Sequence, residues 1–163
     1  MTALPIISPP PDGVRLASPD DEAEVMTMCR RLHAENGVFA MADEKIQSFI
    51  RKGIARDNGI LGVIGPSGSI QASVCLTVAE MWYTRTQHLE EVWTYVMPEY
   101  RNSQNAKNLI AYAKWCSDTI GLPLLIGIMS NTSLEAKQRL YKRQLGDPAG
   151  VFYLHRSKKL GTG

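Results

Sequence analysis

The feature that most constrains this chain is residues 92–110, where an apolar strand, a proline turn and an amphipathic helix follow one another directly. The segment VWTYVM is rich in β-branched and aromatic residues, which favours a buried strand. Pro98 cannot donate to a ladder and ends it. Apolar residues at helical spacing begin just after the polar turn at residues 101–106. That turn therefore lies at a helix N-terminus, where free backbone N–H groups and partial positive charge favour an anion.

Composition excludes several classes of protein. The chain has 163 residues, of which 44% are hydrophobic, so one domain with its own core is expected. A net charge of +2 is too small to indicate nucleic acid on its own. The three cysteines are odd in number and far apart, which favours free thiols in a reducing compartment. No apolar run has the length of a membrane span, and the N-terminus lacks the pattern of a signal peptide. We therefore expect a cytoplasmic domain with neither membrane nor nucleic acid as a partner.

Hydrophobic periodicity and turn residues predict strands at residues 14–17, 59–64, 69–78, 89–97, 122–129 and 151–155, and helices at 18–36, 43–54, 104–120 and 131–145. The order β-α-α-β-β-β-α-β-α-β predicts an α/β (α+β) domain over residues 14–156, with a mixed sheet of six to seven strands flanked by about four helices. The segment 122–129 is apolar on both faces and is predicted to be a central strand. Residues 1–13 form a proline-rich arm that could pack against a second subunit of a homodimer, and residues 157–163 form a tail.

Two other groups of residues could carry chemistry. Cys29 and His33 lie one helical turn apart, but no second pair with ligand spacing exists, so we expect no metal site and place Cys29 in the core. An aromatic cluster at residues 82–95 could stack on nucleic acid, although aromatic strand residues are more often core or pocket wall.

The order of elements and the strand exit Val96-Met97-Pro98-Glu99-Tyr100-Arg101 resemble the GNAT superfamily of acyl-CoA-dependent N-acyltransferases, over about residues 14–155. The signature turn of that family is Arg/Gln-x-x-Gly-x-Gly/Ala. Arg101 and Ala106 match its first and last positions, and Gln104 replaces the central glycine. The resemblance implies that the turn binds the pyrophosphate of acetyl-CoA, and that strand backbone pairs with the pantetheine. The residues implied are Arg101, Ser103, Gln104, Asn105 and Ala106 for the pyrophosphate, and Tyr95, Val96 and Met97 for the pantetheine.

A glycine at the central position lets backbone approach phosphate closely, because it has no Cβ. Gln104 adds bulk at that point, although its side-chain amide could donate a hydrogen bond instead.

A second match lies on the last predicted helix, in Asn131-x4-Ala136-x3-Leu140-Tyr141-x3-Leu145-Gly146. The resemblance implies that Tyr141 protonates the departing CoA thiolate and that Asn131 lies near the pantetheine. Packing beside Leu134 and Leu145 is the structural alternative for Tyr141.

The base that accepts the proton of the amine is Glu90, Glu91 or water. Successive strand residues face opposite sides, so only one of the two glutamates can face the cleft. Glu90, which shares its side with Val92 and Val96, is preferred.

The function expected from this resemblance is an N-acyltransferase that transfers acetyl from acetyl-CoA to an unidentified amine by direct attack, without a metal. The alternative is a GNAT-fold module that binds acyl-CoA or a protein partner without catalysis, and Gln104 is the feature that favours it.

Overall fold

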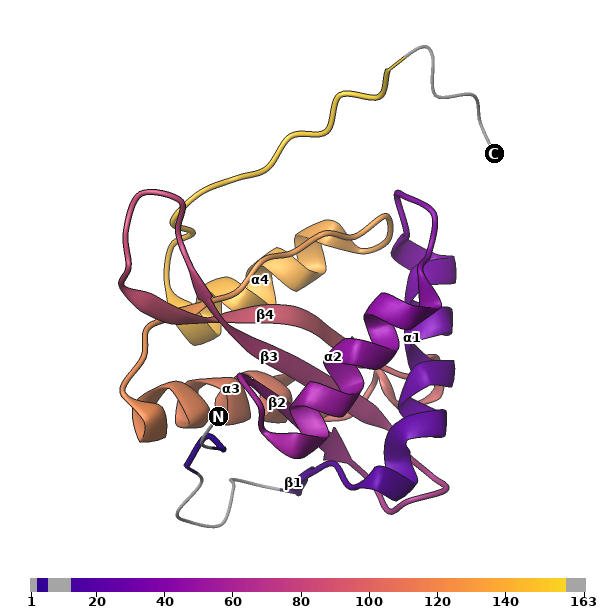
Figure 1. Cartoon of the computed structure of the whole chain (residues 1–163). Coiled ribbons are helices and arrows are strands. Elements are labelled where there is room, and N and C mark those ends of the chain that lie inside the picture. The colour runs from indigo at the N-terminus through magenta and orange to yellow at the C-terminus, as the bar shows by residue number, and fades with distance from the viewer. Residues whose placement is uncertain (1–2, 6–12, 158–163) are drawn as a thin grey trace.

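A computed structural model describes residues 3–5 and 13–157 and shows a twisted sheet covered by helices on both faces (Figure 1). The strands are β1 (Val14–Leu16), β2 (Gly59–Ile64), β3 (Ala72–Glu80), β4 (Gln87–Val96) and β5 (Leu124–Leu125). The helices are α1 (Glu22–Asn36), α2 (Asp43–Ala55), α3 (Asn105–Ile120) and α4 (Leu134–Leu145), with 3-10 turns at Pro19–Asp21 and Pro98–Tyr100. The strands lie in chain order, and every neighbouring pair is antiparallel except β4 and β5, which are parallel.

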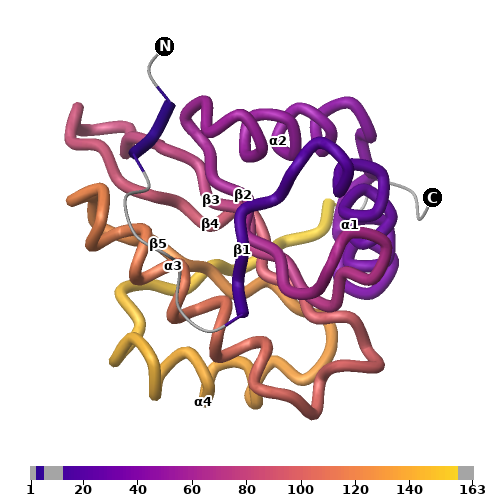
Figure 2. Tube along the Cα trace, turned by 90° about the horizontal axis from the view of Figure 1, so that it is seen from below, coloured from indigo at the N-terminus to yellow at the C-terminus, as the bar shows by residue number. Residues whose placement is uncertain are grey.

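The sheet separates two hydrophobic cores. Helices α1 and α2 cover one face, and α3 and α4 cover the other (Figure 2). Strand residues alternate between the two cores, so β2 gives Ile60 to the α3 side and Leu61 to the α1–α2 side. All residues of β2 are buried, which explains why its sequence is continuously apolar.

The start of α1 is fixed by the buried carboxylate of Asp21. Arg15 donates to both of its oxygens at 2.7 and 2.9 Å, and Ser67 donates at 2.6 Å from the β2–β3 turn. The Ser18 backbone N–H donates to the same carboxylate at 2.8 Å. The hydrogen bonds from Arg15 are the largest influence on Asp21 and hold the pKa of its carboxyl far below the usual range. Asp21 therefore ties β1, α1 and the β2–β3 turn together.

We expect Asp21→Asn to lower the free energy of unfolding by about 3 kcal/mol, because it leaves a buried hydrogen-bond network without its charge. Since the folded pKa of Asp21 is depressed, its contribution is present above the unfolded pKa near 3.8 and is lost as pH falls towards the folded pKa. Urea unfolding at neutral pH and at acid pH measures both effects. Exposed Asp20→Asn is the matched control, and equal effects of the two substitutions would contradict the role of Asp21.

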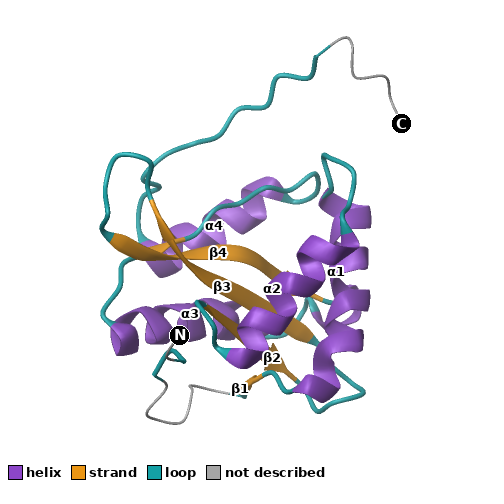
Figure 3. Ribbon diagram, in the orientation of Figure 1, coloured by secondary structure: helices purple, strands orange, loops and turns teal. Residues whose placement is uncertain are grey.

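The fold class is confirmed, and the strand count is lower than predicted. The described residues form five strands, and the segment 122–129 contributes only the two residues of β5, at the edge of the sheet and not at its centre. The segment 151–155 contains no strand, and Phe152 and Tyr153 are about nine-tenths exposed. Figure 3 shows it as a loop leaving the body of the molecule. A β-rich sequence pattern is not enough to form a strand, because the backbone of the segment also needs the edge of another strand with which to hydrogen-bond.

Most of the proline-rich arm and of the tail lie outside the described residues. Within the described part of the arm, the Leu4 N–H donates to the Arg56 carbonyl at 3.1 Å, and Leu4 packs on the core at the α3 side. None of the helices in the described part of the chain has the length and apolar character needed to cross a bilayer.

Candidate active site

Strands β4 and β5 diverge soon after they meet, and a cleft opens between them. Their ladder consists of Leu89 opposite Leu124 and Glu90 opposite Leu125. Beyond Glu90, residues 127–133 and α4 form the opposite wall of a cavity of about 760 Å³. The Met97 N–H donates to the Gln71 carbonyl at 2.9 Å, so it points towards β3. By the alternation of an antiparallel ladder, the backbone groups of Thr94 and Val96 point to the open edge.

A β-bulge at Val92 decides which side chains face the cleft. Cys75 pairs with Trp93 and Leu76 pairs with Glu91, so Val92 has no partner in β3. The extra residue reverses the alternation, and Glu91 lies on the same face of β4 as Thr94, opposite to Trp93. Strict alternation along β4 predicts that Glu91 and Trp93 face the same side of the sheet. That prediction is wrong, because the bulge at Val92 shifts the alternation by one residue.

Glu91 and Tyr141 meet inside the cleft. The Tyr141 hydroxyl donates to a Glu91 carboxylate oxygen at 3.3 Å, which joins β4 to α4. Burial raises the pKa of the Glu91 carboxyl to about 7, and hydrogen bonds from Thr94, Tyr141 and the Gly127 backbone N–H offset part of that rise. Burial, with the charge of Glu91, also raises the pKa of Tyr141 above its usual value. The pair thus places a proton acceptor that titrates near neutrality beside a phenol that stays protonated.

A second polar cluster closes the other end of the open β4 edge. Arg101 donates to Glu35 of α1 at 2.6 Å and to the Val96 carbonyl at 3.2 Å, and its guanidinium carbon lies 5.4 Å from the centre of the Tyr95 ring. The Tyr95 hydroxyl also donates to Glu35. Burial acts to raise the pKa of Glu35, but the hydrogen bonds from Tyr95 and Arg101 outweigh it and lower that pKa. Arg101 therefore lies along the β4 edge and not over the turn that follows it.

The turn at residues 101–106 leads into α3, whose N-cap is Gln104 with φ −81° and ψ 2°. Any residue adopts these angles, so glycine at this position would add space and no conformational freedom. The Ser103 N–H donates to the Tyr100 carbonyl at 3.2 Å, and the Asn105 N–H donates to the Ser103 hydroxyl at 3.1 Å. The Asn105 side chain donates to Gln71 at 3.2 Å. The N–H groups of Ser103 and Asn105 thus have partners within the protein.

Asn131 lies where the wall opposite β4 meets α1. Its backbone N–H donates to the buried Asn36 side chain at 3.0 Å, and its own side chain contacts the Glu35 carbonyl at 3.5 Å. Nearby, Lys137 donates to Ser130 at 2.5 Å. Burial, and then the positive charge of Arg101, lower the pKa of Lys137. Lys137 and Arg101 together make this end of the cleft positive.

The cleft brings together several of the residues predicted from the sequence, namely Tyr95, Val96, Arg101, Ala106, Asn131 and Tyr141. The others do not line it: Glu90, Met97, Ser103, Gln104 and Asn105. The Glu90 side chain is about half exposed and lies 3.9 Å from His88. Sequence reasoning missed Glu35, Thr94 and Lys137, since no motif marks them and their contacts join distant elements.

Cys29 and His33, the residues weighed for thiol or metal chemistry, both lie on α1. Cys29 is buried in the α1–α2 core, and burial raises the pKa of its thiol to about 12. The His33 ring forms a hydrogen bond with the Phe39 carbonyl at 2.8 Å. Residues 3–5 and 13–157 hold no group of three or more His, Cys, Asp or Glu arranged for a metal ion.

Comparison with solved structures supports the fold, whereas comparison by sequence finds no match. No family model and no curated protein matches the sequence. Among solved structures, a protein from Clostridium acetobutylicum described as a predicted acetyltransferase, with acetyl-CoA, has a TM-score of 0.68 at 13% identity, covering 87% of this chain and 94% of that one. AAC(6')-Iy in complex with the bisubstrate analogue CoA-S-monomethyl-acetylneamine has a TM-score of 0.68 at 11% identity, covering 89% of this chain and 97% of that one. An integron cassette protein from the Cole Harbour Salt Marsh metagenome has a TM-score of 0.67 at 18% identity, covering 90% of each chain. The chain has the fold of the GNAT acetyltransferases.

Proposed function

We propose that the protein is an acyl-CoA-dependent N-acyltransferase that transfers acetyl from acetyl-CoA to an amine. The observation that carries the proposal is the pair of Glu91 and Tyr141 in the cleft between β4 and β5, where an ionisable acid with a pKa near neutrality contacts a partly buried phenol. Acyl transfer from a thioester to an amine needs these two functions, a group that accepts a proton from nitrogen and one that donates a proton to sulfur.

Glu91 and Tyr141 together can accept and donate all the protons that the reaction moves. The amine nitrogen attacks the thioester carbon and forms a tetrahedral intermediate, and the C–S bond then breaks. Glu91 takes the proton that the nitrogen loses, and Tyr141 gives its proton to the sulfur. Since their oxygens lie 3.3 Å apart, protonated Glu91 can return a proton to Tyr141 and reset the site. The products are an N-acetyl amine and free CoA.

The open edge of β4 suits the pantetheine, because the backbone groups of Thr94 and Val96 point towards it. The cations Arg101 and Lys137, with Ala106 in the first turn of α3, line the cleft and suit the pyrophosphate. In the structure Arg101 bonds to Glu35 and to the Val96 carbonyl, so acyl-CoA has to displace it from the edge. We propose that Arg101 exchanges Glu35 for phosphate when acyl-CoA binds. The three cysteines are buried and free, which fits the proposed cytoplasmic location.

Acetyl-CoA at about 100 times its Kd is expected to raise the free energy of unfolding by about 2.7 kcal/mol, which corresponds to a rise in Tm of roughly 5 °C or more. Arg101→Ala is expected to weaken acetyl-CoA binding about tenfold, because it removes a charge-assisted partner of the phosphate. Thermal melts and calorimetric titration measure both effects. Exposed Arg85→Ala, on the β3–β4 turn, is the control and should bind as the wild type does.

The alternative function is a GNAT-fold module that binds acyl-CoA or a protein partner without catalysis. It is favoured by Gln104 and by the internal bonds of the Ser103 and Asn105 N–H groups. Acetyl-CoA binding without acetyl transfer to any amine would support a binding module. An unchanged Tm at millimolar acetyl-CoA would contradict the enzyme.

A further inference from the structure

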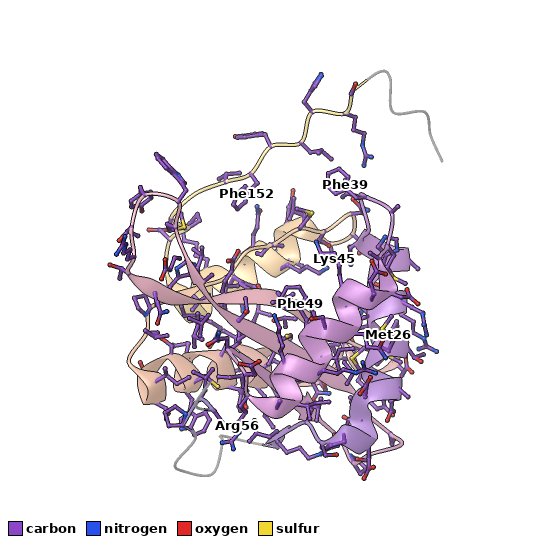
Figure 4. The ribbon with its side chains drawn as sticks, viewed as in Figure 1. Met26, Phe39, Lys45, Phe49, Arg56 and Phe152 are labelled. Atoms are coloured by element: carbon purple, nitrogen blue, oxygen red, sulfur yellow. The ribbon has the colours of Figure 1, made fainter. Side chains whose placement is uncertain are left out.

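A second cavity of about 320 Å³ lies beside the cleft, between α1, α2 and the bulged part of β4. We call it the side pocket. Its walls are mostly apolar and include Cys29, Leu32, Ile46, Phe49, Val92 and Trp93. Leu32, Val92 and Met129 also line the cleft, so the two spaces adjoin each other. Figure 4 shows Phe49 and Lys45 following one another along the same side of α2, with Lys45 nearer to Phe39.

The β-bulge connects the side pocket to the proposed base. Val92 and Trp93 both belong to the α1–α2 side of the sheet and line the side pocket, whereas Glu91 faces Tyr141 in the cleft. One peptide bond separates the apolar wall from the residue that would take the proton. A group held in the side pocket can therefore present an amine to the cleft over the bulge.

The charges around the two cavities select against cations. Among the residues that the structure describes, Glu91 is the one carboxylate that lines either cavity. Positive side chains line both, namely Arg101, Lys137 and Arg156 in the cleft and Lys45 in the side pocket. Arg101 and Lys137 are assigned to the pyrophosphate, so Lys45 and Arg156 are the lining cations that would face an acceptor. A second ammonium group on the acceptor would lie near this like charge, and Glu91, which takes the proton of the reacting amine, would not be available to pair with it.

We infer that the side pocket binds the body of the acceptor, and that the acceptor is a monoamine with one aryl or branched alkyl group and no second positive charge. The inference rests on the proposed function, because the cleft has to supply the acetyl group. The size agrees, since a cavity of roughly 150 Å³ holds a benzene ring and the side pocket has about twice that volume. The class of substrate excluded is the polycationic one, which includes polyamines and aminoglycosides.

The first experiment compares amines as acceptors for acetyl-CoA. The probes are 2-phenylethylamine, isoamylamine, methylamine and spermidine, and release of CoA thiol is followed. We expect kcat/KM for 2-phenylethylamine and isoamylamine to exceed that for methylamine and for spermidine by about tenfold or more. A preference for spermidine over the two apolar amines would overturn the inference.

The second experiment changes the side pocket and its rim. Ile46→Trp fills the side pocket and is expected to raise KM for 2-phenylethylamine at least tenfold, with acetyl-CoA affinity unchanged; Ile46→Val is the conservative control. Lys45→Glu is expected to raise the ratio of kcat/KM for spermidine to kcat/KM for 2-phenylethylamine about tenfold. Exposed Lys52→Glu, on the same helix but outside the side pocket, is the matched control and should leave the ratio unchanged. An unchanged ratio in Lys45→Glu would count against the electrostatic argument.

Direct binding separates this inference from the proposed function. Titration of 2-phenylethylamine into the wild type, Ile46→Trp and Ile46→Val by calorimetry does not need acetyl transfer. One outcome is that 2-phenylethylamine binds to the wild type and to Ile46→Val but not to Ile46→Trp, while acetyl-CoA does not bind. That outcome would contradict the proposed function and support the side pocket as an amine-binding site. The other outcome is that acetyl-CoA binds, while neither apolar amine binds or is acetylated. That outcome would contradict the assignment of the side pocket and leave the proposed function standing.

Discussion

Tyr141→Phe is expected to lower kcat for acetyl transfer by about 100-fold or more while leaving the Kd for acetyl-CoA unchanged. The substitution removes only the hydroxyl that donates to Glu91, so the ring still fills its place on α4. A thiolate without a proton donor is a poorer leaving group, and loss of general acid catalysis typically costs about 10²–10⁴-fold in rate. Single-turnover kinetics with saturating acetyl-CoA measure the step itself.

Exposed Tyr83 on the β3–β4 turn gives a matched control, and Tyr83→Phe should keep wild-type kcat. Calorimetric titration of both variants with acetyl-CoA separates binding from chemistry. A Tyr141→Phe variant with wild-type kcat would show that Tyr141 only packs in the cleft. A variant that loses affinity and rate together would place the hydroxyl in ground-state binding.

Glu91→Gln is the second large effect, and we expect it to lower kcat/KM by about 100-fold, since glutamine cannot accept the proton of the amine. Burial raises the pKa of Glu91 to about 7, and only the ionised carboxylate is a base. The wild-type rate should therefore rise with pH through a midpoint near 7, and Glu91→Gln should lose that step. An acceptor amine whose conjugate acid has a pKa below 5 stays unprotonated from pH 5 to pH 9, so the profile then reports the enzyme and not the amine.

Glu90→Gln is the natural partner of this experiment, because the two glutamates are adjacent in sequence and the bulge at Val92 separates their surroundings. We expect Glu90→Gln to keep wild-type activity and the same pH midpoint. If Glu90→Gln loses the activity and Glu91→Gln keeps it, the assignment made from the structure is wrong. If neither loses it, water carries the proton.

The same ionisation predicts the sign of a stability change. The folded pKa of Glu91 lies above its unfolded value, so the folded state holds a proton that the unfolded chain has released between about pH 4.5 and 7. Its contribution to the free energy of unfolding therefore falls as pH rises through that window. Urea unfolding of the wild type across that range should show a loss that is absent in Glu91→Gln.

Local patterns determined most of the secondary structure. Helices α1, α3 and α4 each end just before a glycine, as predicted, whereas α2 ends at Ala55 with Arg56 in the left-handed conformation. Strand β2 is buried throughout because its residues are apolar on both faces. The last two predicted strands show the limit. The segment 122–129 pairs with β4 over two residues, and the segment 151–155 forms no strand, although both have β-rich sequences. A strand depends on the edge beside it, and the sequence of the segment alone does not describe that edge.

The candidate site divides in the same way. The sequence by itself pointed to Tyr141, Arg101 and the turn before α3, because each lies in a recognisable local pattern. Only the tertiary structure placed Glu91, and not Glu90, beside Tyr141, and only it paired Arg101 with Glu35, 66 positions away in sequence. The bulge at Val92 arises from the register of β3 against β4, so no periodicity within β4 reveals it. The raised pKa of Glu91 likewise depends on burial by α4 and residues near Gly127, which are distant in the chain.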